Sequence, residues 1–505
     1  MGQPTEESES VALPVRGSMA RNAFWLALGQ GATTALAIVL TAALGRWLGA
    51  ADFGTYYVLM TMSTSSYLLL EWGQSLWVVR ETARAPERGG ELLGTALAFR
   101  LGVSLAAAIP VGLLTYSLGY GVRTTWLFVL LFLANIPLFL AQGFGIAFRA
   151  AERMARDAAV SVANKVLILA VALPALAIGA GIPGIIVAQA AAGLAALVMA
   201  RSLYAGMKGL PLTASRATAR ALVLGGLPVL STAIAGAAQP YLEAVILSTL
   251  APATVVGYFG AARNIVGTLL APSVIIGTAS YPRIARVGHD PVALPGEVQA
   301  ALRPVLWLAA LGATGTYLFA DTAVGLIYGA GFAPAATILR VYAGALFLLF
   351  IDILFGNILY AVGKVLSFAV VLAAKVIVSA GLCFILVPIL QERTGNGGIG
   401  IVLAVTLSEL MVMACALVLL PRGTLARHAA LDTARALAAA GVTVLLFRVL
   451  PPINPWLGIP VCVTTFAAAS WVVGLMRRRD VDSLLGLFRR PRGGGGVFTF
   501  FDFGG

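Results

Sequence analysis

The sequence predicts an all-α membrane protein that crosses the bilayer many times. The chain of 505 residues is 60% hydrophobic and 11% charged, with a mean hydropathy of +0.94, whereas soluble domains carry about 25% charged residues. Apolar runs close to or longer than about 20 residues, the length of a transmembrane helix, recur from one end to the other. A transmembrane β-barrel would instead alternate apolar and polar residues.

Turn-forming and charged residues separate these apolar runs. The first run follows a polar segment, is too long for the core of a signal peptide and lacks a small-residue cleavage site, so we expect it to remain as a span. Stretches such as "GAAD", "GAGIPG" and "LPPINP" are typical of breaks between helices. We expect about fourteen spans, at residues 23–45, 56–78, 93–116, 125–147, 159–179, 184–204, 220–249, 254–281, 304–327, 337–360, 366–390, 399–420, 428–448 and 456–476.

The basic residues predict the orientation of these spans. If the N-terminus is cytoplasmic, Lys and Arg on the inside segments outnumber those on the outside segments by about six to one. The positive-inside rule therefore places both termini in the cytoplasm. The net charge of +13 then faces anionic lipid headgroups rather than nucleic acid. The outside loops are mostly very short, which excludes an external catalytic domain.

An internal repeat relates the first six spans to the next six. The stretch "LGAADFGTYYV" (48–58) resembles "LAPATVVGYFGAAR" (250–263), and "PGIIVAQAAAGL" (183–194) resembles "IGIVLAVTLSEL" (399–410). Because six is even, both halves begin on the same side of the membrane, as in transporters with parallel repeats. Basic residues recur in this alignment: Arg80 with Arg283, Arg100 with Arg303, and Lys165 with Lys375.

The repeat predicts the domain organisation. Two lobes of six helices are followed by an appended pair of helices, and polar segments form both ends of the chain. The expected parts are a cytoplasmic N-terminal segment (1–21), an N-lobe with spans 1–6 (22–208), a C-lobe with spans 7–12 (217–422), spans 13 and 14 (427–478) and a cytoplasmic tail (479–505).

Two ionisable residues near the junction of the halves are the first candidates for a functional site. A guanidinium at the bilayer centre costs about 2.5–3.5 kcal/mol on insertion scales, so ionisable residues inside spans are functional candidates. Arg263 and Glu243 lie at similar depth on consecutive spans. A guanidinium also matches the geometry of a phosphate group. The candidate substrate-binding residues are Gln239, Tyr241, Glu243, Arg263 and Asn264.

Other charges inside the spans form expected ion pairs. Glu71 and Arg100 match in depth, and so do Asp352 and Lys375. Mutual neutralisation inside the helix bundle is the structural interpretation of both pairs. Glu71 is also a second candidate for the substrate or for a coupling ion. Two further charged residues have no expected partner: Lys165 and Glu409.

No catalytic, metal or cofactor site is expected. Cys383, Cys415 and Cys462 lie inside apolar runs, where buried small apolar side chains are expected, and His289 and His428 lie in loops. The phosphate-binding pattern GxxxxGK[ST] is absent, so no ATP site is expected. Transport would then draw on a gradient of H⁺ or Na⁺, on the membrane potential or on the gradient of the substrate.

The stretch "LGRWLGAADFGTYYVLMTM" (44–62), followed by "EWGQSLWVVRETAR" (71–84), resembles the oligosaccharide flippases of the polysaccharide transporter family. Their superfamily, MOP, also holds the multidrug and toxin extruders and the lipid II flippases. With its fourteen spans and repeat, the resemblance extends to about residue 478. The residues that carry it are Asp52, Phe53, Gly54, Tyr56 or Tyr57, Gly73, Arg80 and Arg84.

The resemblance implies two six-helix lobes around a central cavity, lined mainly by spans 1, 2, 7 and 8, and a mechanism of alternating access. The implied protein is a non-enzymatic flippase of the cytoplasmic membrane that moves an oligosaccharide on undecaprenyl pyrophosphate to the outer leaflet. Arg263 would then hold the pyrophosphate or an acidic sugar, and Glu71 would couple to protons or sodium. The implied partners are the lipid-linked oligosaccharide, membrane lipids, and a polysaccharide polymerase or glycosyltransferase complex.

Other functions remain open beside this one. Lipid II flippases usually carry several basic residues in the cavity of the first lobe, where this chain has only Arg46 near the outer end of span 1. Multidrug extruders usually have twelve spans, whereas this chain is expected to have two more, spans 13 and 14. A lipid II flippase, a drug or cation antiporter, a membrane scaffold with purely structural ion pairs, and a polytopic polymerase or ligase are the alternatives.

Overall fold

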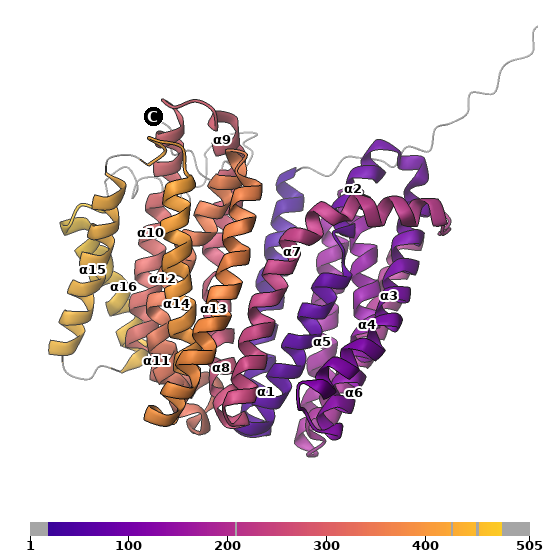
Figure 1. The fold of residues 1–505 in the computed structure, drawn as a ribbon, viewed down its shortest axis with the longest axis horizontal. Helices are drawn as coiled ribbons and strands as arrows, with labels where there is room; N and C mark the ends of the chain where they lie inside the picture. The colour runs from indigo at the N-terminus through magenta and orange to yellow at the C-terminus, as the bar shows by residue number, and fades with distance from the viewer. Residues whose placement is uncertain (1–18, 208–209, 426–427, 451–453, 477–505) are drawn as a thin grey trace, which may run out of the picture. The chain divides into compact units, whose positions relative to one another are not determined.

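The computed structural model describes residues 19–207, 210–425, 428–450 and 454–476. These residues form α-helices joined by short turns, with two 3-10 turns and no β-strand among them (Figure 1). The expected all-α fold is therefore confirmed. The segments expected at 1–21 and 479–505 lie almost entirely outside the described residues.

The chain divides into two compact units. Unit 1 takes the chain up to Leu40 together with Leu59–Ala237, and unit 2 takes Thr41–Val58 together with the chain from Ala238 onward. Two long helices, α1 (Met19–Leu70) and α7 (Arg216–Leu250), contribute residues to both units. The lobe boundaries expected from the repeat stay a prediction.

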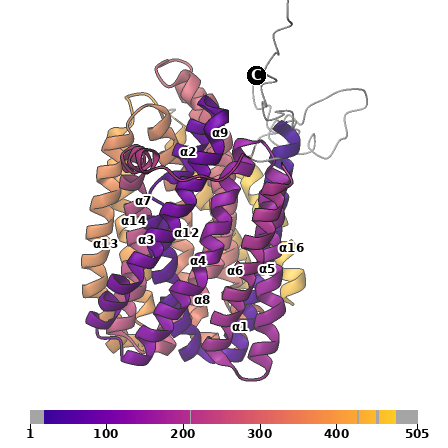
Figure 2. The same cartoon turned by 90° about the vertical axis from the view of Figure 1, so that its right-hand side faces the viewer.

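In unit 1, α4 lies against both α3 and α6, and α5 lies against α6 (Figure 2). Small residues allow this close packing, because Gly193 of α6 directly faces the backbone of α4 at Leu138. Large apolar side chains such as Phe144 and Phe148 fill the core between these helices. Besides its parts of α1 and α7, unit 1 contains α2 (Gln74–Arg84), η1 (Pro86–Arg88), α3 (Gly89–Ser117), α4 (Val122–Ala150), α5 (Met154–Ala177) and α6 (Gly181–Ala205).

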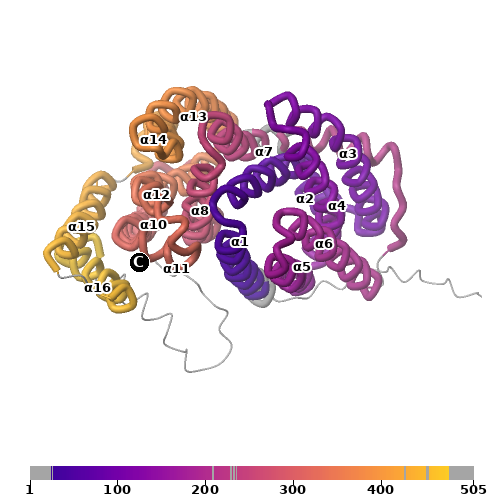
Figure 3. Tube along the Cα trace, turned by 90° about the horizontal axis from the view of Figure 1, so that it is seen from below, coloured from indigo at the N-terminus to yellow at the C-terminus, as the bar shows by residue number. Residues whose placement is uncertain are grey.

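Unit 2 is organised around α12, which packs against α8, α9, α10, α11, α13 and α14. Buried positions occur all round α12, as expected for a helix in the middle of a bundle. The final pair, α15 and α16, packs on α10 (Figure 3). The helices are α8 (Ala253–Leu269), α9 (Ala271–Val287), α10 (Leu294–Leu318), α11 (Ala320–Tyr328), η2 (Ala330–Phe332), α12 (Ala333–Ala361), α13 (Val365–Thr394), α14 (Gly398–Leu419), α15 (Ala429–Val449) and α16 (Pro455–Val472).

The helix breaks only partly follow the predicted spans. Among the described residues, eleven helical segments are long and apolar enough to cross a membrane, or up to twelve with one bent pair. One of them, Ala27–Arg84, holds 58 residues, with most of the first expected span and all of the second. Gly49, with φ 72° and ψ 173°, interrupts the helix between them, in a conformation that glycine adopts readily. The expected count of fourteen stays a prediction.

Two expected spans are not continuous helices. The span expected at 254–281 is divided between α8 and α9, because Pro272 lacks the backbone N–H that would extend the first helix. The span expected at 304–327 is divided between α10 and α11, which are bent by 71° with respect to each other. The two expected spans stay predictions: the stretch Ala253–Val287 is long and apolar enough to be one span, and α10 with α11 forms the bent pair.

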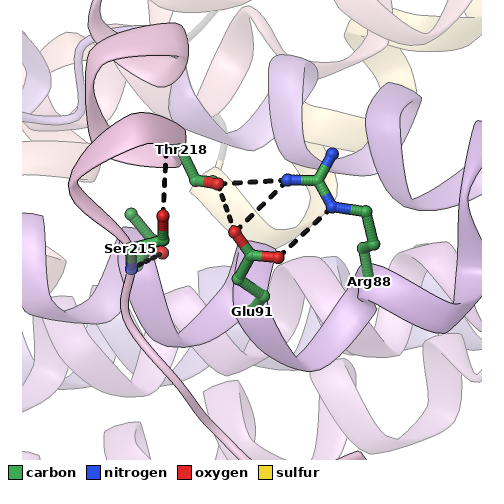
Figure 4. Close-up of polar contacts among 5 residues, drawn as sticks. Arg88, Glu91, Ser215 and Thr218 are labelled. Atoms are coloured by element: carbon green, nitrogen blue, oxygen red, sulfur yellow. Dashed lines mark hydrogen bonds and ion pairs between the residues drawn. The ribbon is translucent and has the colours of Figure 1, made fainter.

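The first part of α7 is held within unit 1 by a polar cluster at the start of α3 (Figure 4). The Arg88 guanidinium donates to both carboxylate oxygens of Glu91, each at 3.2 Å, and to Thr218 Oγ1 at 3.1 Å. The Thr218 hydroxyl in turn donates to Glu91. Further along α7, Trp72 Nε1 donates to the carbonyl oxygen of Val223 at 3.1 Å.

The buried positions confirm the internal repeat and refine its alignment. Buried residues of α6 recur in α14 at a constant offset, so Gly193 corresponds to Glu409. The same comparison between α5 and α13 pairs Asn164, Ile168, Ala172 and Leu176 with Lys375, Ser379, Cys383 and Val387. The counterpart of Lys375 is therefore Asn164, and the expected alignment with Lys165 was wrong by one residue.

Repeat-related glycines also make a close helix contact within unit 2. A Cβ atom on Gly54 would collide with the carbonyl oxygen of Ala253, and one on Gly257 would collide with the carbonyl oxygen of Ala50. Gly54 and Gly257 are repeat counterparts, and so are Ala50 and Ala253. The two helices thus touch backbone to backbone through equivalent residues, and only glycine allows that approach.

We predict that Gly54→Ala destabilises the protein, because the added methyl group meets backbone that cannot move aside. Overpacking of this kind typically costs about 1–3 kcal/mol. Thermal unfolding of the purified protein in detergent measures the effect. The matched control is Gly267→Ala on α8, where a Cβ meets open space. An equal melting temperature for the two variants would contradict the close contact.

Candidate functional site

Arg263 lies on α8 and contacts residues of α7 and α12. Its Nε lies 3.9 Å from Glu243 Oε2, and its Nη1 donates to the Tyr342 hydroxyl at 3.3 Å. The Glu243 side chain is 2% exposed, whereas the Arg263 side chain keeps 25% of its surface exposed. The structure therefore pairs the two expected charges and leaves part of the Arg263 side chain exposed.

The neighbouring residues hold this pair in place. Gln239 lies one turn before Glu243 on α7 and donates from Nε2 to Glu243 Oε1 at 2.9 Å. Gly260, one turn before Arg263, faces the ring of Tyr57 so closely that a Cβ would lie 2.6 Å from it. The Phe259 ring contacts those of Tyr57 and Tyr342. Small residues on α8 thus bring the guanidinium close to its partners.

The remaining candidates of this group have different surroundings. The side chain of Asn264 interacts with the Tyr328 hydroxyl, which also contacts Thr41. Tyr241 is half-buried on α7. The structure therefore brings Gln239, Glu243 and Arg263 into one hydrogen-bonded group and places Asn264 beside it, with its side chain engaged by Tyr328.

Sequence reasoning missed Tyr342 of this site. Tyr342 is fully buried on α12, where it lies within a long apolar run and resembles an ordinary core residue. Its counterpart in the repeat is Leu131 of α4, which has no hydroxyl group. The sequence did contain one signal, namely a hydroxyl group at Tyr342 and none at Leu131. It can be recognised only after the two halves of the repeat have been aligned.

Glu71 caps a helix instead of standing free. α1 ends at Leu70 and α2 begins at Gln74, with Trp72 and Gly73 in left-handed conformations between them. The Glu71 carboxylate accepts from the backbone N–H of Gly73 at 2.9 Å and of Ser75 at 2.6 Å. These are orphan donors at the start of α2, where a carboxylate is also favoured by the helix dipole.

Arg100 completes the group around the helix break. Its Nη2 lies 3.5 Å from Glu71 Oε1, its Nη1 donates to the carbonyl oxygen of Phe139 at 2.8 Å, and its Nε donates to Gln74 at 3.3 Å. The guanidinium carbon also lies 4.4 Å from the centre of the Phe139 ring. The expected pair between Glu71 and Arg100 is present in the structure, and it stabilises the break between α1 and α2.

The second expected ion pair has a third member. Lys375 Nζ lies 4.0 Å from Asp352 Oδ2 and also pairs with Glu409. The expectation that Glu409 has no partner was wrong, because α14 brings it beside α13. Lys165 forms no ion pair with an acidic residue in the described part of the chain.

Two further arginines serve the structure of unit 2. Arg46 of α1 donates to the carbonyl oxygens of Leu326 and Ile327 at the end of α11, where a cation is favoured by the helix dipole. Arg303 donates to Asp432 Oδ2 at 2.9 Å and so joins α10 to α15. Sequence reasoning missed this second contact, because Asp432 lies far along the chain.

Metal-ligating residues do not gather anywhere in the described ranges. No group of three or more His, Cys, Asp or Glu side chains there is placed to hold a metal ion. Cys383, Cys415 and Cys462 are free thiols, of which the first and last are buried. The chemistry available at the candidate site is therefore that of a guanidinium, a carboxylate and tyrosine hydroxyl groups.

We predict that Glu71→Ala destabilises unit 1 by about 3–5 kcal/mol, because it leaves the buried Arg100 cation without its counter-charge. Thermal unfolding measures the loss, and faster hydrogen exchange at the amides of Gly73 and Ser75 locates it. Glu81→Ala on α2 is the control, since Glu81 pairs only with exposed arginines. Similar melting temperatures for the two variants would argue against the capping role.

Comparison with solved structures shows a shared fold. The lipid II flippase MurJ in an inward closed conformation superposes with a TM-score of 0.71 at 13% identity, over 91% of this chain and all of that one. A multidrug resistance MATE family transporter of the MOP superfamily, in an inward-facing conformation, gives 0.61 at 14% identity over 76% and 94% of the two chains. A MOP superfamily transporter from Pyrococcus furiosus gives 0.58 at 16% identity over 80% and 96%.

Sequence comparison gives the family. No curated protein sequence matches the chain significantly. The model of a family described as polysaccharide biosynthesis protein matches residues 19–287, which is more than half of the chain. With its apolar helices and its MOP fold, this multi-pass membrane protein belongs to the polysaccharide biosynthesis protein family.

Proposed function

We propose that this membrane transporter flips a lipid-linked oligosaccharide, carried on undecaprenyl pyrophosphate, across the cytoplasmic membrane by alternating access. Family membership and the MOP fold support a transporter that acts in polysaccharide synthesis. The observation that carries the choice of an anionic lipid carrier is Arg263, a cation within the helix bundle that contacts Glu243 and Tyr342 and whose side chain keeps 25% of its surface exposed.

The geometry of Arg263 suits a pyrophosphate. Its Nε lies 3.9 Å from Glu243 Oε2, and its Nη1 donates to the Tyr342 hydroxyl. A guanidinium keeps its charge at any physiological pH and binds phosphate oxygens through several N–H groups. Glu243 offsets the cost of carrying this charge in an apolar bundle, and Tyr342 fixes its direction.

Transport would also depend on the orientation of the protein in the membrane, on an energy source and on partner proteins. Both termini would lie in the cytoplasm, as the distribution of basic residues indicates. A gradient of protons or sodium would supply the energy. A polysaccharide polymerase or glycosyltransferase complex would deliver or receive the glycan. Glu71 would act as a structural cap and not as an ion-coupling group, since both of its oxygens accept backbone hydrogen bonds.

Flipping of lipid II is the second candidate, favoured by the structural similarity to MurJ over 91% of the chain. Lipid II also carries a pyrophosphate on an undecaprenyl chain, so Arg263 would serve either cargo. Arg46, the basic residue expected near the outer end of span 1, is used to bind the end of α11. The lipid that accumulates without the protein distinguishes the two cargoes.

We predict that cells without the gene accumulate one undecaprenyl-linked oligosaccharide, and that Arg263→Ala fails to clear it. Loss of a charge-assisted hydrogen bond costs about 1.5–3 kcal/mol, which slows transport about 10- to 100-fold. Mass spectrometry of extracted membrane lipids measures the intermediate. Arg263→Lys is expected to restore clearance in part, because it keeps the charge and loses the planar geometry.

Arg340→Ala is the matched control, since this arginine pairs with the exposed Asp321. Equal amounts of each variant in the membrane, checked by immunoblot, exclude a folding defect. Accumulation of lipid II in the deletion strain would identify the second candidate. An unchanged lipid profile, or full clearance by Arg263→Ala, would refute the proposal.

A further inference from the structure

Unit 2 contains a buried group of three charges on three neighbouring helices. Asp352 of α12, Lys375 of α13 and Glu409 of α14 have side chains that are 14%, 7% and 0% exposed. Lys375 is the only cation of the three and pairs with both carboxylates. Asp352 Oδ1 and Glu409 Oε2 are buried and have no hydrogen-bond partner. We call these residues the Lys375 cluster.

The surroundings do not neutralise the Lys375 cluster. Glu243 is a further charge that acts on Glu409, and its own counter-charge is Arg263. The Tyr360 hydroxyl is a titratable neighbour of Asp352 and is uncharged at neutral pH. The Lys375 cluster with Glu243 and Arg263 therefore holds three carboxylates and two cations. A buried negative charge without a partner is strongly unfavourable.

The repeat shows that packing does not require these charges. The counterpart of Lys375 in unit 1 is Asn164, and Gly193 and Ala141 occupy the positions that correspond to Glu409 and Asp352. The same three helices thus pack together in unit 1 with neutral side chains. Helix packing alone therefore does not account for the three charges of the Lys375 cluster in unit 2.

We propose that the Lys375 cluster is a proton-binding site, in which one proton resides on the carboxylates of Asp352 and Glu409 and its exchange with water is coupled to transport. Uptake forms one O–H bond on a carboxylate oxygen and release breaks it, with no other bond changed. The proton supplies the missing positive charge and gives a buried carboxylate oxygen a hydrogen to donate.

Coupling follows from the position of the Lys375 cluster between helices. With the proton bound, the group of three charges is neutral and stable in an apolar interior. After release, the uncompensated charge favours a state in which α12, α13 and α14 admit water. The coupling to transport rests on the function proposed above, whereas the binding of a proton does not.

Infrared difference spectroscopy of the purified full-length protein tests the proton directly. A protonated carboxyl group absorbs at a carbonyl frequency that ionised carboxylates lack. We expect this band at neutral pH, and we expect Glu409→Gln and Asp352→Asn each to remove it. The control Asp321→Asn, at an exposed carboxylate, should leave it unchanged. No band in the native protein, or a band that survives both substitutions, would overturn the proposal.

The lipid assay tests the coupling. Glu409→Gln imitates the permanently protonated side chain, so we expect the variant to reach the membrane in normal amounts and still accumulate the lipid intermediate. Asp352→Asn serves the same purpose if Glu409→Gln fails to fold. Normal clearance by both variants would overturn the coupling even if the band is present. If the deletion strain accumulates no lipid intermediate, the proposed function fails, and the infrared result still decides whether the proton is bound.

Discussion

A charged side chain inside an apolar helix bundle needs its counter-charge on a neighbouring helix, and this constraint joins helices within each of the two units. Arg100 connects α3 to the break after α1, Arg263 connects α8 to α7 and α12, and Lys375 connects α13 to α12 and α14. Apolar side chains alone would let such helices slide past one another, since lipid is as apolar as they are. The ion pairs fix which helices meet and at what depth.

Sequence reasoning predicted well how deep in the membrane each charged residue lies along its helix. Glu243 with Arg263, and Glu71 with Arg100, were paired by counting residues from a shared turn, and the structure contains both pairs. Contacts between helices distant in sequence could not be found in this way. Glu409 and Tyr342 approach their partners through helix neighbours that no count along the chain specifies.

The long apolar helices were predictable because hydropathy and helix length report the same physical requirement. The breaks were less predictable. A proline inside a membrane helix either kinks it or ends it, and the surrounding helices decide which. Pro272 ends α8 early, whereas Pro137 remains within α4. The repeat alignment was off by one residue at Lys165, because the sequence alone does not distinguish the buried face of α5 from its exposed face.

The contact between Arg303 and Asp432 has a consequence for biogenesis. The two residues are 129 positions apart, and Asp432 belongs to the first of the two appended helices. During synthesis α10 is therefore made before the partner of Arg303. Because Arg303 directly precedes the span expected at 304–327, its charge can stay near water until α15 is translated. Insertion of the last two helices would then be the event that commits unit 2 to its final packing.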